Sequence, residues 1–298
     1  MDRREGESRY FGNEEHQIYW GDATSVLEHQ IADESIDLIF ADPPYNIGKQ
    51  FGQFLDRWAS EESYVEWCHK WLTLCIKKLK PNGTFYVMTS TQAMPYFDLF
   101  LRNKMSILSR IVWHYDSSGV QAKTKYGSMY EPLLHCVKDE DNYTFNTDAI
   151  LVEARTGSVR KLMDYRKAEP TPYNTTKVPG NVWYFPRVRY RMPEYENHPS
   201  QKPEAFLERI ILASSNHGDT VLDPFSGTFT TSAVAKRLQR KSVGIELERE
   251  YVKIGLRRLA IQDHFEGEEL KAPNKDYVRK NGKNKSISTP GLFGEEIW

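Results

Sequence analysis

Several features are scarce in or missing from the sequence, and each absence excludes a class of protein. The 298 residues include only three cysteines, Cys68, Cys75 and Cys136, and no Cys-x-x-Cys pair, which excludes a disulfide framework and a zinc knuckle. No stretch approaches the ~18 consecutive apolar residues of a membrane span, and residues 1–7 lack the apolar core of a signal peptide. We therefore expect a soluble, intracellular, globular protein whose thiols are free and buried.

The chain also lacks an excess of either charge sign. It has 40 basic and 41 acidic side chains and a formal net charge of −1. A near-neutral total does not exclude a nucleic-acid partner, because the local distribution of charge decides that interaction. Hydrophobic residues make up 39% and aromatic residues 13% of the chain, which excludes disorder as its overall state.

Motifs of several enzyme classes are absent as well. There is no Gly-x-Gly-x-x-Gly and no Gly-Lys-Ser/Thr loop, so neither a dinucleotide nor ATP is expected. There is no His-Glu-x-x-His and no Gly-x-Ser-x-Gly. His264-Phe265-Glu266 imitates a zinc-deaminase motif, but no cysteine pair follows it, so we expect a surface histidine and no metal.

Apolar periodicity predicts strands that alternate with helices. Strands are expected over 17–20, 35–41, 84–88, 107–114, 133–137, 220–222 and 242–245, and helices over 24–31, 60–79, 203–215, 231–238 and 248–262. This alternation predicts an α/β fold with a doubly wound, mostly parallel sheet. Periodicity fades over 143–197, and residues 263–298 form a polar tail.

One candidate site follows the strand at 220–222. Asp223-Pro224-Phe225-Ser226-Gly227-Thr228-Phe229 lies between this strand and a helix, where doubly wound folds bind ligands. Glu246 ends the next strand, where a carboxylate can accept hydrogen bonds from both hydroxyls of a ribose. Together they predict a nucleoside-cofactor site; the alternative is an ordinary strand-turn-helix with a capping hydroxyl.

A second candidate site is Asp42-Pro43-Pro44-Tyr45, directly after an apolar strand. Prolines fix the backbone and remove N–H groups, which leaves carbonyls free to accept hydrogen bonds. A carboxylate beside such a carbonyl suits the two N–H bonds of an exocyclic amino group, and the Tyr45 ring offers a face for a planar base. The alternative is a surface turn, since proline and aspartate favour turns.

These motifs resemble those of S-adenosylmethionine-dependent DNA amino-methyltransferases. Asp42–Tyr45 is similar to their catalytic motif, and Asp223–Gly227 to their cofactor motif. The cofactor motif comes 181 residues after the catalytic one, which is the order in the circularly permuted beta group. The segment from Asn197 to Pro203 and the Gly21-Asp22 turn resemble two further motifs of the group. Stretches around 113–119 and 177–183 resemble its YhdJ-type adenine methyltransferases.

The resemblance implies a circularly permuted, seven-stranded, Rossmann-like methyltransferase domain with a target-recognition region. The catalytic half would span 11–142, the target-recognition region 143–197 and the cofactor half 198–262, before the polar tail. The residues that match cofactor-binding positions are Asp22, Ser200, Lys202, Asp223, Phe225, Gly227, Phe229 and Glu246. Phe229 departs from the pattern, because the family often has glycine or a small residue there. Its ring would crowd the methionine end of the cofactor or pack against the loop.

The implied reaction is transfer of a methyl group from S-adenosylmethionine to N6 of a flipped adenine in double-stranded DNA. Asp42 and the Pro43 carbonyl would accept the two amino hydrogens, while Pro44 shapes the motif and Tyr45 stacks on the base. Aspartate at position 42 favours adenine over cytosine within the family. The alternatives are cytosine N4, an RNA adenine, a protein glutamine, or a DNA-binding module without turnover.

A basic segment is the candidate DNA surface. Residues 151–191 carry nine basic and three acidic side chains, a net +6, interleaved with aromatic residues, which fits phosphate contact and base readout. Arg187 and Arg189 are expected to contact DNA, and Lys123 and Lys125 offer a second contact; a solvated loop is the alternative for both. The family resemblance also implies a homodimer. The absence of a secretion signal and the implied DNA substrate predict a location in the cytoplasm, at the nucleoid. The sequence identifies neither a restriction partner nor the recognition site.

Overall fold

A nine-stranded mixed sheet runs through the protein in the computed structural model, which describes residues 8–116, 123–124, 126–154, 162–166 and 168–271. In order across the sheet, the strands are β1 (Arg9–Gly12), β2 (His16–Trp20), β15 (Lys241–Glu246), β14 (Thr220–Asp223), β3 (Ile36–Ala41), β6 (Leu79–Met88), β8 (Tyr130–Val137), β7 (Ser106–His114) and β13 (Val182–Tyr184). All seven predicted strands are present, and the short strands β1 and β13 extend the two edges.

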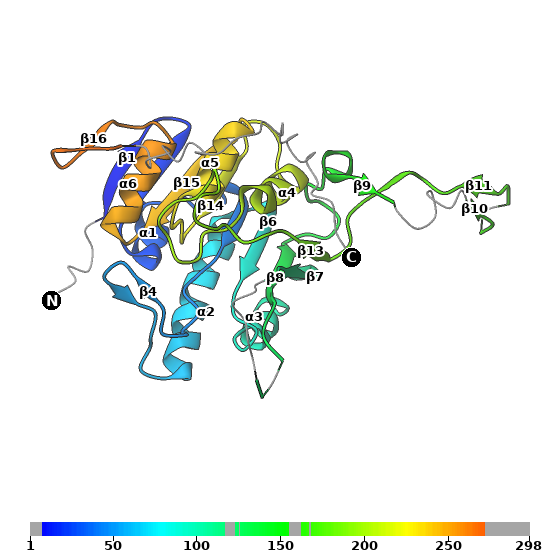
Figure 1. Ribbon diagram of the computed structural model, residues 1–298, viewed down its shortest axis with the longest axis horizontal. Coiled ribbons are helices and arrows are strands. Elements are labelled where there is room, and N and C mark those ends of the chain that lie inside the picture. Colours follow the sequence, from blue (N-terminus) through cyan, green and yellow to red (C-terminus); the bar gives the residue numbers. More distant parts are fainter. Residues whose placement is uncertain (1–7, 117–122, 125, 155–161, 167, 272–298) are drawn as a thin grey trace, which may run out of the picture.

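The strand directions confirm a mostly parallel sheet. From β2 through β15, β14 and β3 to β6, each strand is parallel to its neighbour. β8 is antiparallel to both β6 and β7, whereas β13 is parallel to β7. Because β14 and β15 lie between β2 and β3, strands from the two ends of the chain form one sheet (Figure 1).

Helices cover both faces of this sheet. α1 (Ala23–His29), α2 (Glu61–Lys78) and α3 (Met94–Leu101) share one apolar cluster, whereas α4 (Glu204–Ser214), α5 (Thr230–Arg237) and α6 (Arg249–Arg258) pack on the opposite face. Side chains alternate between the faces along a strand: Ile39 and Ala41 of β3 belong to the first cluster, and Leu38 and Phe40 to the second. Burial on both faces explains why the central strands have nearly continuous apolar sequences.

Local sequence fixes the ends of α2. Ser60 and Ser63 form a reciprocal capping box, Glu61 and Glu62 lie in the first turn, and Lys77 and Lys78 lie in the last, as the helix dipole favours. Cys68 and Cys75 lie on its buried face, and they and Cys136 are free and buried, as predicted. α3 was not predicted; its sequence, MPYFDLFL, is too uniformly apolar to show a helical period.

The predicted target-recognition region divides into two parts. Its short elements are η1 (Thr147–Ile150), β9 (Val152–Glu153), β10 (Met163–Asp164), β11 (Thr171–Pro172) and β12 (Thr176–Lys177). β9 pairs with β12 and β10 with β11. The segment that contains these four strands projects away from the sheet (Figure 1). β13, by contrast, belongs to the central sheet.

The start of the predicted tail is folded. β16 (His264–Phe265) and β17 (Glu268–Glu269) form a hairpin, and Phe265 is buried in the cluster that contains α6 residues. The polar composition of the segment concealed this buried apolar side chain, while residues 272–298 lie outside the described part. Among the described residues, no helix is both long and apolar enough to cross a membrane.

Candidate active site

A cavity of about 730 Å³ lies at the carboxyl edge of the parallel strands. Its lining includes Asp42–Tyr45 after β3, Phe225 and Gly227 after β14, Glu246 at the end of β15 and Asp22 after β2. Ligands bind at this edge in open α/β sheets, and the volume lies within the usual range for small-molecule sites. The fold therefore brings both predicted motifs to one cavity.

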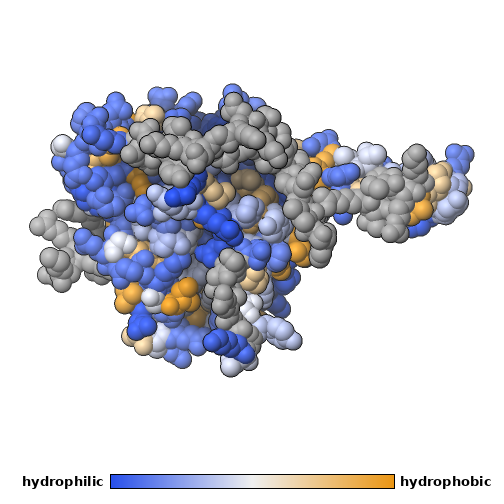
Figure 2. All heavy atoms as spheres, viewed as in Figure 1, coloured by the Kyte–Doolittle hydropathy of each residue, from blue (hydrophilic) through white to orange (hydrophobic). Residues whose placement is uncertain are grey.

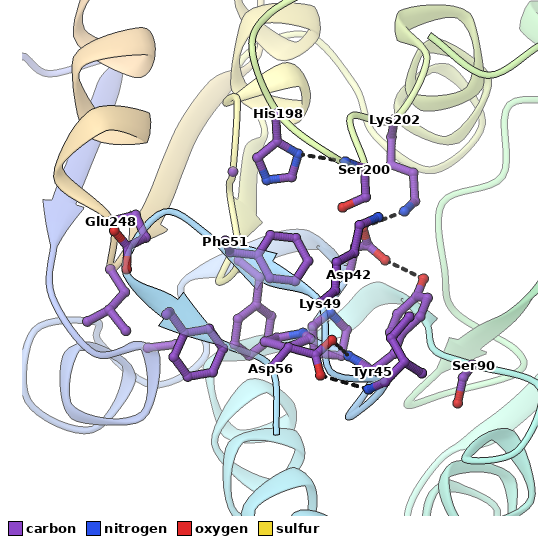
Figure 3. A pocket seen from close by; sticks show the side chains of 18 of the residues that line it. Asp42, Tyr45, Lys49, Phe51, Asp56, Ser90, His198, Ser200, Lys202 and Glu248 are labelled. Carbon is purple, nitrogen blue, oxygen red and sulfur yellow. Dashed lines mark hydrogen bonds and ion pairs between the residues drawn. The ribbon is translucent and has the colours of Figure 1, made fainter. Parts of the chain in front are cut away.

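Asp42 is held by two neighbours (Figure 3). The Tyr45 hydroxyl donates to Asp42 Oδ1 at 2.5 Å, and the Lys202 ammonium lies 2.6 Å from Asp42 Oδ2. Lys202 is buried and its ammonium lies 5.7 Å from the centroid of the Tyr45 ring. The resemblance assigns Lys202 to the cofactor, but in the structure it pairs with Asp42.

Glu131 of β8 completes this cluster and was missed by the sequence analysis. Its Oε2 lies 3.0 Å from the Tyr45 hydroxyl and 3.3 Å from Lys202 Nζ, and its Oε1 lies 3.4 Å from the Tyr115 hydroxyl. A carboxylate at the start of an otherwise apolar strand was the only signal available, because its partners are far away in the sequence.

Burial and charge shift the pKa values in this cluster. Burial raises the pKa of Asp42 against the opposing effect of Lys202, and the Glu131 charge adds to the increase. Burial also acts on Glu131, but Lys202 and the Tyr45 hydroxyl hold its pKa below the usual value. Despite burial, the two carboxylates raise the pKa of Lys202 to about 12, so the lysine stays cationic.

The carbonyls of the two prolines in the motif differ in their hydrogen bonding. The Pro44 carbonyl accepts a hydrogen bond from the Tyr64 hydroxyl of α2 at 2.9 Å. The Pro43 carbonyl has no hydrogen-bond partner among the residues that the structure describes. An acceptor without a partner therefore lies next to the Asp42 carboxylate, as the sequence predicted.

Asp56 fixes the backbone that follows the motif. It is 1% exposed, and its carboxylate accepts hydrogen bonds from the Tyr45 N–H at 3.2 Å and the Ile47 N–H at 2.8 Å. Its backbone carbonyl also accepts a bond from Gly48 N–H. Asp56 therefore orders the segment that carries Tyr45, although nothing in the local sequence distinguishes it from a surface aspartate.

A hairpin of β4 (Gln50–Phe51) and β5 (Phe54–Leu55) connects the two halves of the cavity. Its turn is held by Glu248, which accepts a hydrogen bond from Gln53 N–H at 3.1 Å. Lys49 Nζ donates to the Pro199 carbonyl at 2.9 Å, and the Phe51 ring lies 5.6 Å from that of His198 (Figure 3). The hairpin therefore belongs to the cavity wall.

Glu246 and Gly227 form the predicted cofactor end of the cavity. Gly227 has φ +50, and its N–H donates to Glu246 Oε2 at 2.7 Å. Glu246 Oε1 accepts a bond from Glu248 N–H at 2.7 Å. Burial raises the pKa of Glu246 to about 7 despite these bonds. A carboxylate so placed has lone pairs for ligand hydroxyl groups, which fits the ribose of a nucleoside cofactor.

The other predicted cofactor residues differ in whether they line the cavity. Asp22, Ser200 and Phe225 line the cavity. Asp223 does not line it: one carboxylate oxygen accepts a bond from Phe225 N–H at 3.0 Å and the other from the Thr231 hydroxyl at 2.5 Å. Burial raises the pKa of Asp223 to about 7. Its oxygens shape the loop, and because Asp223 is buried outside the cavity lining, its direct contact with a cofactor is not supported.

The predicted cofactor contact of Phe229 is corrected by the structure. Its side chain is fully buried in the cluster between α6 and the sheet and is not among the residues that line the cavity. Gly244 of β15 and Gly255 of α6 flank the ring, which fills the space that side chains would occupy at both positions. Packing against these glycines directs the ring away from the cofactor loop.

The predicted DNA-contacting residues also differ in placement. Arg187 lines the cavity and lies 5.1 Å from the centroid of the Tyr115 ring, whereas the exposed Arg189 donates to the Asp116 carbonyl at 3.2 Å. Both arginines therefore lie beside the segment that follows β7. Lys123 is exposed, and Lys125 lies outside the described residues.

The comparisons with known proteins identify the family. The N6/N4 methyltransferase family model, described as DNA methylase, matches residues 36–257, so the chain belongs to this family of DNA methyltransferases. DNA adenine methyltransferase YhdJ of Escherichia coli (strain K12) is 60% identical over 272 residues, which cover 91% of each chain. Type II methyltransferase M.HpaI of Haemophilus parainfluenzae is 37% identical over 231 residues, 77% of this chain and 69% of that protein.

Solved structures confirm the fold. The cytosine-N4-specific PvuII DNA methyltransferase matches with a TM-score of 0.60 and 20% identity, covering 83% of this chain and 89% of that chain. The M1.HpyAVI–SAM complex matches with a TM-score of 0.55 and 24% identity, covering 82% and 98%. At these identities the likeness concerns the fold, a Rossmann-like methyltransferase sheet.

Proposed function

We propose that this DNA methyltransferase transfers a methyl group from S-adenosylmethionine to N6 of an adenine flipped out of double-stranded DNA. The observation that carries the proposal is the ion-paired Asp42 beside the unbonded Pro43 carbonyl, in the same cavity as Glu246. The 60% identity to an adenine methyltransferase supports adenine as the base, as does aspartate rather than serine at position 42.

The cavity fits the cofactor at its Glu246 end. Glu246 can accept the ribose hydroxyls, and the left-handed Gly227 lets the backbone approach closely. A Cβ at Gly227 would lie 3.1 Å from His198 Nε2, so a larger residue would close the space between this loop and His198. When bound, S-adenosylmethionine supplies an electrophilic methyl group on a positively charged sulfur.

Asp42 and Pro43 would orient the amino group that receives the methyl group. Accepting its two hydrogens draws the nitrogen lone pair out of conjugation with the ring and directs it towards the methyl carbon. This is catalysis by positioning and electrostatics. The Tyr45 ring lines the cavity while its hydroxyl is fixed on Asp42, so its ring can stack on the base without losing that bond.

DNA would approach on the side of the cavity that carries Arg187 and Arg189. The projecting segment adds aromatic and apolar side chains that are exposed, including Met163, Tyr165 and Tyr173, and Figure 2 shows it standing clear of the body. Arg166 of this segment is already paired with Asp164 at 2.8 Å. The DNA substrate would place the enzyme at the nucleoid, and a homodimer remains a prediction for sedimentation analysis.

The test is transfer of label from S-adenosylmethionine to unmethylated genomic DNA, followed by nucleoside analysis. Label in N6-methyldeoxyadenosine is expected; label in N4-methyldeoxycytidine would contradict the assigned base. Asp42→Ala should abolish transfer without weakening cofactor binding, since Asp42 contacts the amino group in this proposal. Transfer by Asp42→Ala in a single-turnover assay would contradict its role. Cofactor binding without any transfer would favour a DNA-binding module.

A further inference from the structure

Glu131 is a carboxylate whose side chain is only 16% exposed and for which the proposed methyl transfer has no direct use. It shares Lys202 and the Tyr45 hydroxyl with Asp42, at the distances given above. A tyrosine hydroxyl has one proton to donate, so it cannot neutralise two carboxylates. A second carboxylate in a desolvated site is costly unless it is fully paired, so its presence here points to a function.

Glu131 and Asp42 share one ion-paired lysine. The groups that face Glu131 are Asp42, Tyr45, Lys49, Tyr115, Arg187 and Lys202, and Asp223 is a further neighbour of Asp42. Lys202 is 7% exposed and compensates one of the two carboxylates. Arg187 and Lys49 are partly exposed, as Asp42 and Glu131 are, but among the described residues Lys202 is the only cation that forms an ion pair with either carboxylate. The ion-paired group of Asp42, Glu131 and Lys202 therefore has a net charge of −1.

We infer that Glu131 is a positioning residue that holds Lys202 and Tyr45 on Asp42 and whose negative charge favours methyl transfer to the amino nitrogen. The inference rests on the proposed function. In the transfer the carbon–sulfur bond breaks with its electron pair remaining on sulfur, and the nitrogen lone pair forms the new carbon–nitrogen bond. Positive charge thereby moves from sulfur towards Asp42. One N–H bond then breaks, and its proton passes to Asp42 and on to water.

Glu131→Gln removes the charge and keeps the shape of the side chain. For a positive charge that moves from about 8 Å to about 5 Å from Glu131 at an effective dielectric constant of about 20, we expect the loss of the carboxylate to slow single-turnover transfer about tenfold. A binding measurement tests the same charge without turnover. The ratio of the affinities for S-adenosylmethionine, which is cationic at sulfur, and S-adenosylhomocysteine, which is neutral there, should fall by about threefold or more in calorimetry.

The pH profile separates this role from a purely structural one. The Glu131 charge contributes to the raised pKa of Asp42, so Glu131→Gln should lower that pKa. Because Asp42 acts as the ionised acceptor, the acid limb of the single-turnover rate should move to lower pH even though the plateau is lower. A loss of packing alone would lower the rate without moving the acid limb in this direction.

Two variants serve as controls. Glu140→Gln makes the same charge change at an exposed residue beyond the other end of β8 and should change neither the affinity ratio nor the profile. Glu131→Asp retains the charge and should retain most of the affinity ratio. An unchanged ratio and an unmoved acid limb in folded Glu131→Gln would overturn the inference. If the wild-type protein transferred no methyl group to DNA, the proposed function would fail, whereas the affinity ratio would still test the charge.

Discussion

Replacing Phe229 with alanine tests whether this side chain belongs to the core or to the cofactor. The ring is fully buried with Ile18 of β2 and residues of α6. A Cβ built on Gly244 would lie 2.6 Å from Phe229 Cε1, and one built on Gly255 would lie 2.5 Å from Cδ2. Since neither glycine can contribute a side chain, truncating the ring leaves a cavity that its immediate neighbours cannot fill.

The expected loss is large. Phenylalanine-to-alanine changes in cores cost about 3–5 kcal/mol of unfolding free energy, and a site flanked by two glycines belongs at the upper end of that range. The left-handed φ of +55 at position 229 is equally unfavourable for alanine, so no backbone relief offsets the cavity. Gly255→Ala in the wild-type background should cost about 1–3 kcal/mol by overpacking. The double variant should be less destabilised than the sum, because the new methyl group enters the cavity.

Urea unfolding of the wild type, Phe229→Ala, Gly255→Ala and the double variant measures their stability, and calorimetric titration of S-adenosylmethionine measures their affinity for the cofactor. Phe265→Ala is the matched control, because Phe265 is 1% exposed and belongs to the same cluster. Both phenylalanine variants should lose stability while the folded fraction binds the cofactor normally. A loss below about 1 kcal/mol in Phe229→Ala, together with a selective loss of cofactor affinity, would refute the core assignment.

Three further predictions concern the cavity. The pKa of Glu246 is raised to about 7 and only its ionised form accepts both ribose hydroxyls, so cofactor affinity should fall as the pH drops below about 7; calorimetry should show this dependence to be absent in Glu246→Gln. A Cβ at Gly52, where φ is +56, would lie 2.5 Å from Glu248 Oε2, so Gly52→Ala should displace the hairpin and speed cofactor dissociation in stopped-flow measurements. Asp56→Asn replaces one acceptor of a backbone N–H and should weaken the hydrogen bonding that holds the Tyr45 segment by about 1 kcal/mol. Single-turnover transfer should then be slower, with unchanged cofactor affinity.

The elements that could be predicted from the sequence are those with local causes. The central strands are buried on both faces, so their apolar runs were visible without any knowledge of their neighbours. Ser60 at the start of α2 and the prolines after β3 act on the adjacent backbone. The two motifs could be placed in one site because the carboxyl ends of parallel strands share an edge. The short strands β1 and β13 were missed because three or four residues show no period.

The rest of the site depends on contacts between residues far apart in the sequence. Glu131 is 86 positions from Tyr45 in the chain, yet their side chains lie 3.0 Å apart. The position of Phe229 likewise depends on Gly244 and Gly255, which are unremarkable in their own segments. Asp56 meets the backbone after the catalytic motif only because the hairpin folds back. Local sequence patterns carry no information about these distant contacts, so they could not indicate the positions of Glu131, Phe229 and Asp56 in the site.

The charges of the site also explain why the two ends of the chain must fold as one domain. The first half of the domain, residues 11–142, contributes Asp42 and Glu131, and the second half, residues 198–262, contributes Lys202, which forms ion pairs with both. Each half alone would leave a buried charge without its partner, which costs several kcal/mol. The hairpin contact with Glu248 adds a second connection between the halves. The permuted order of the motifs is therefore tolerated because the ion pairs form across the sheet, where chain order does not matter. Asp42 acquires its cation only when the second half of the domain is in place.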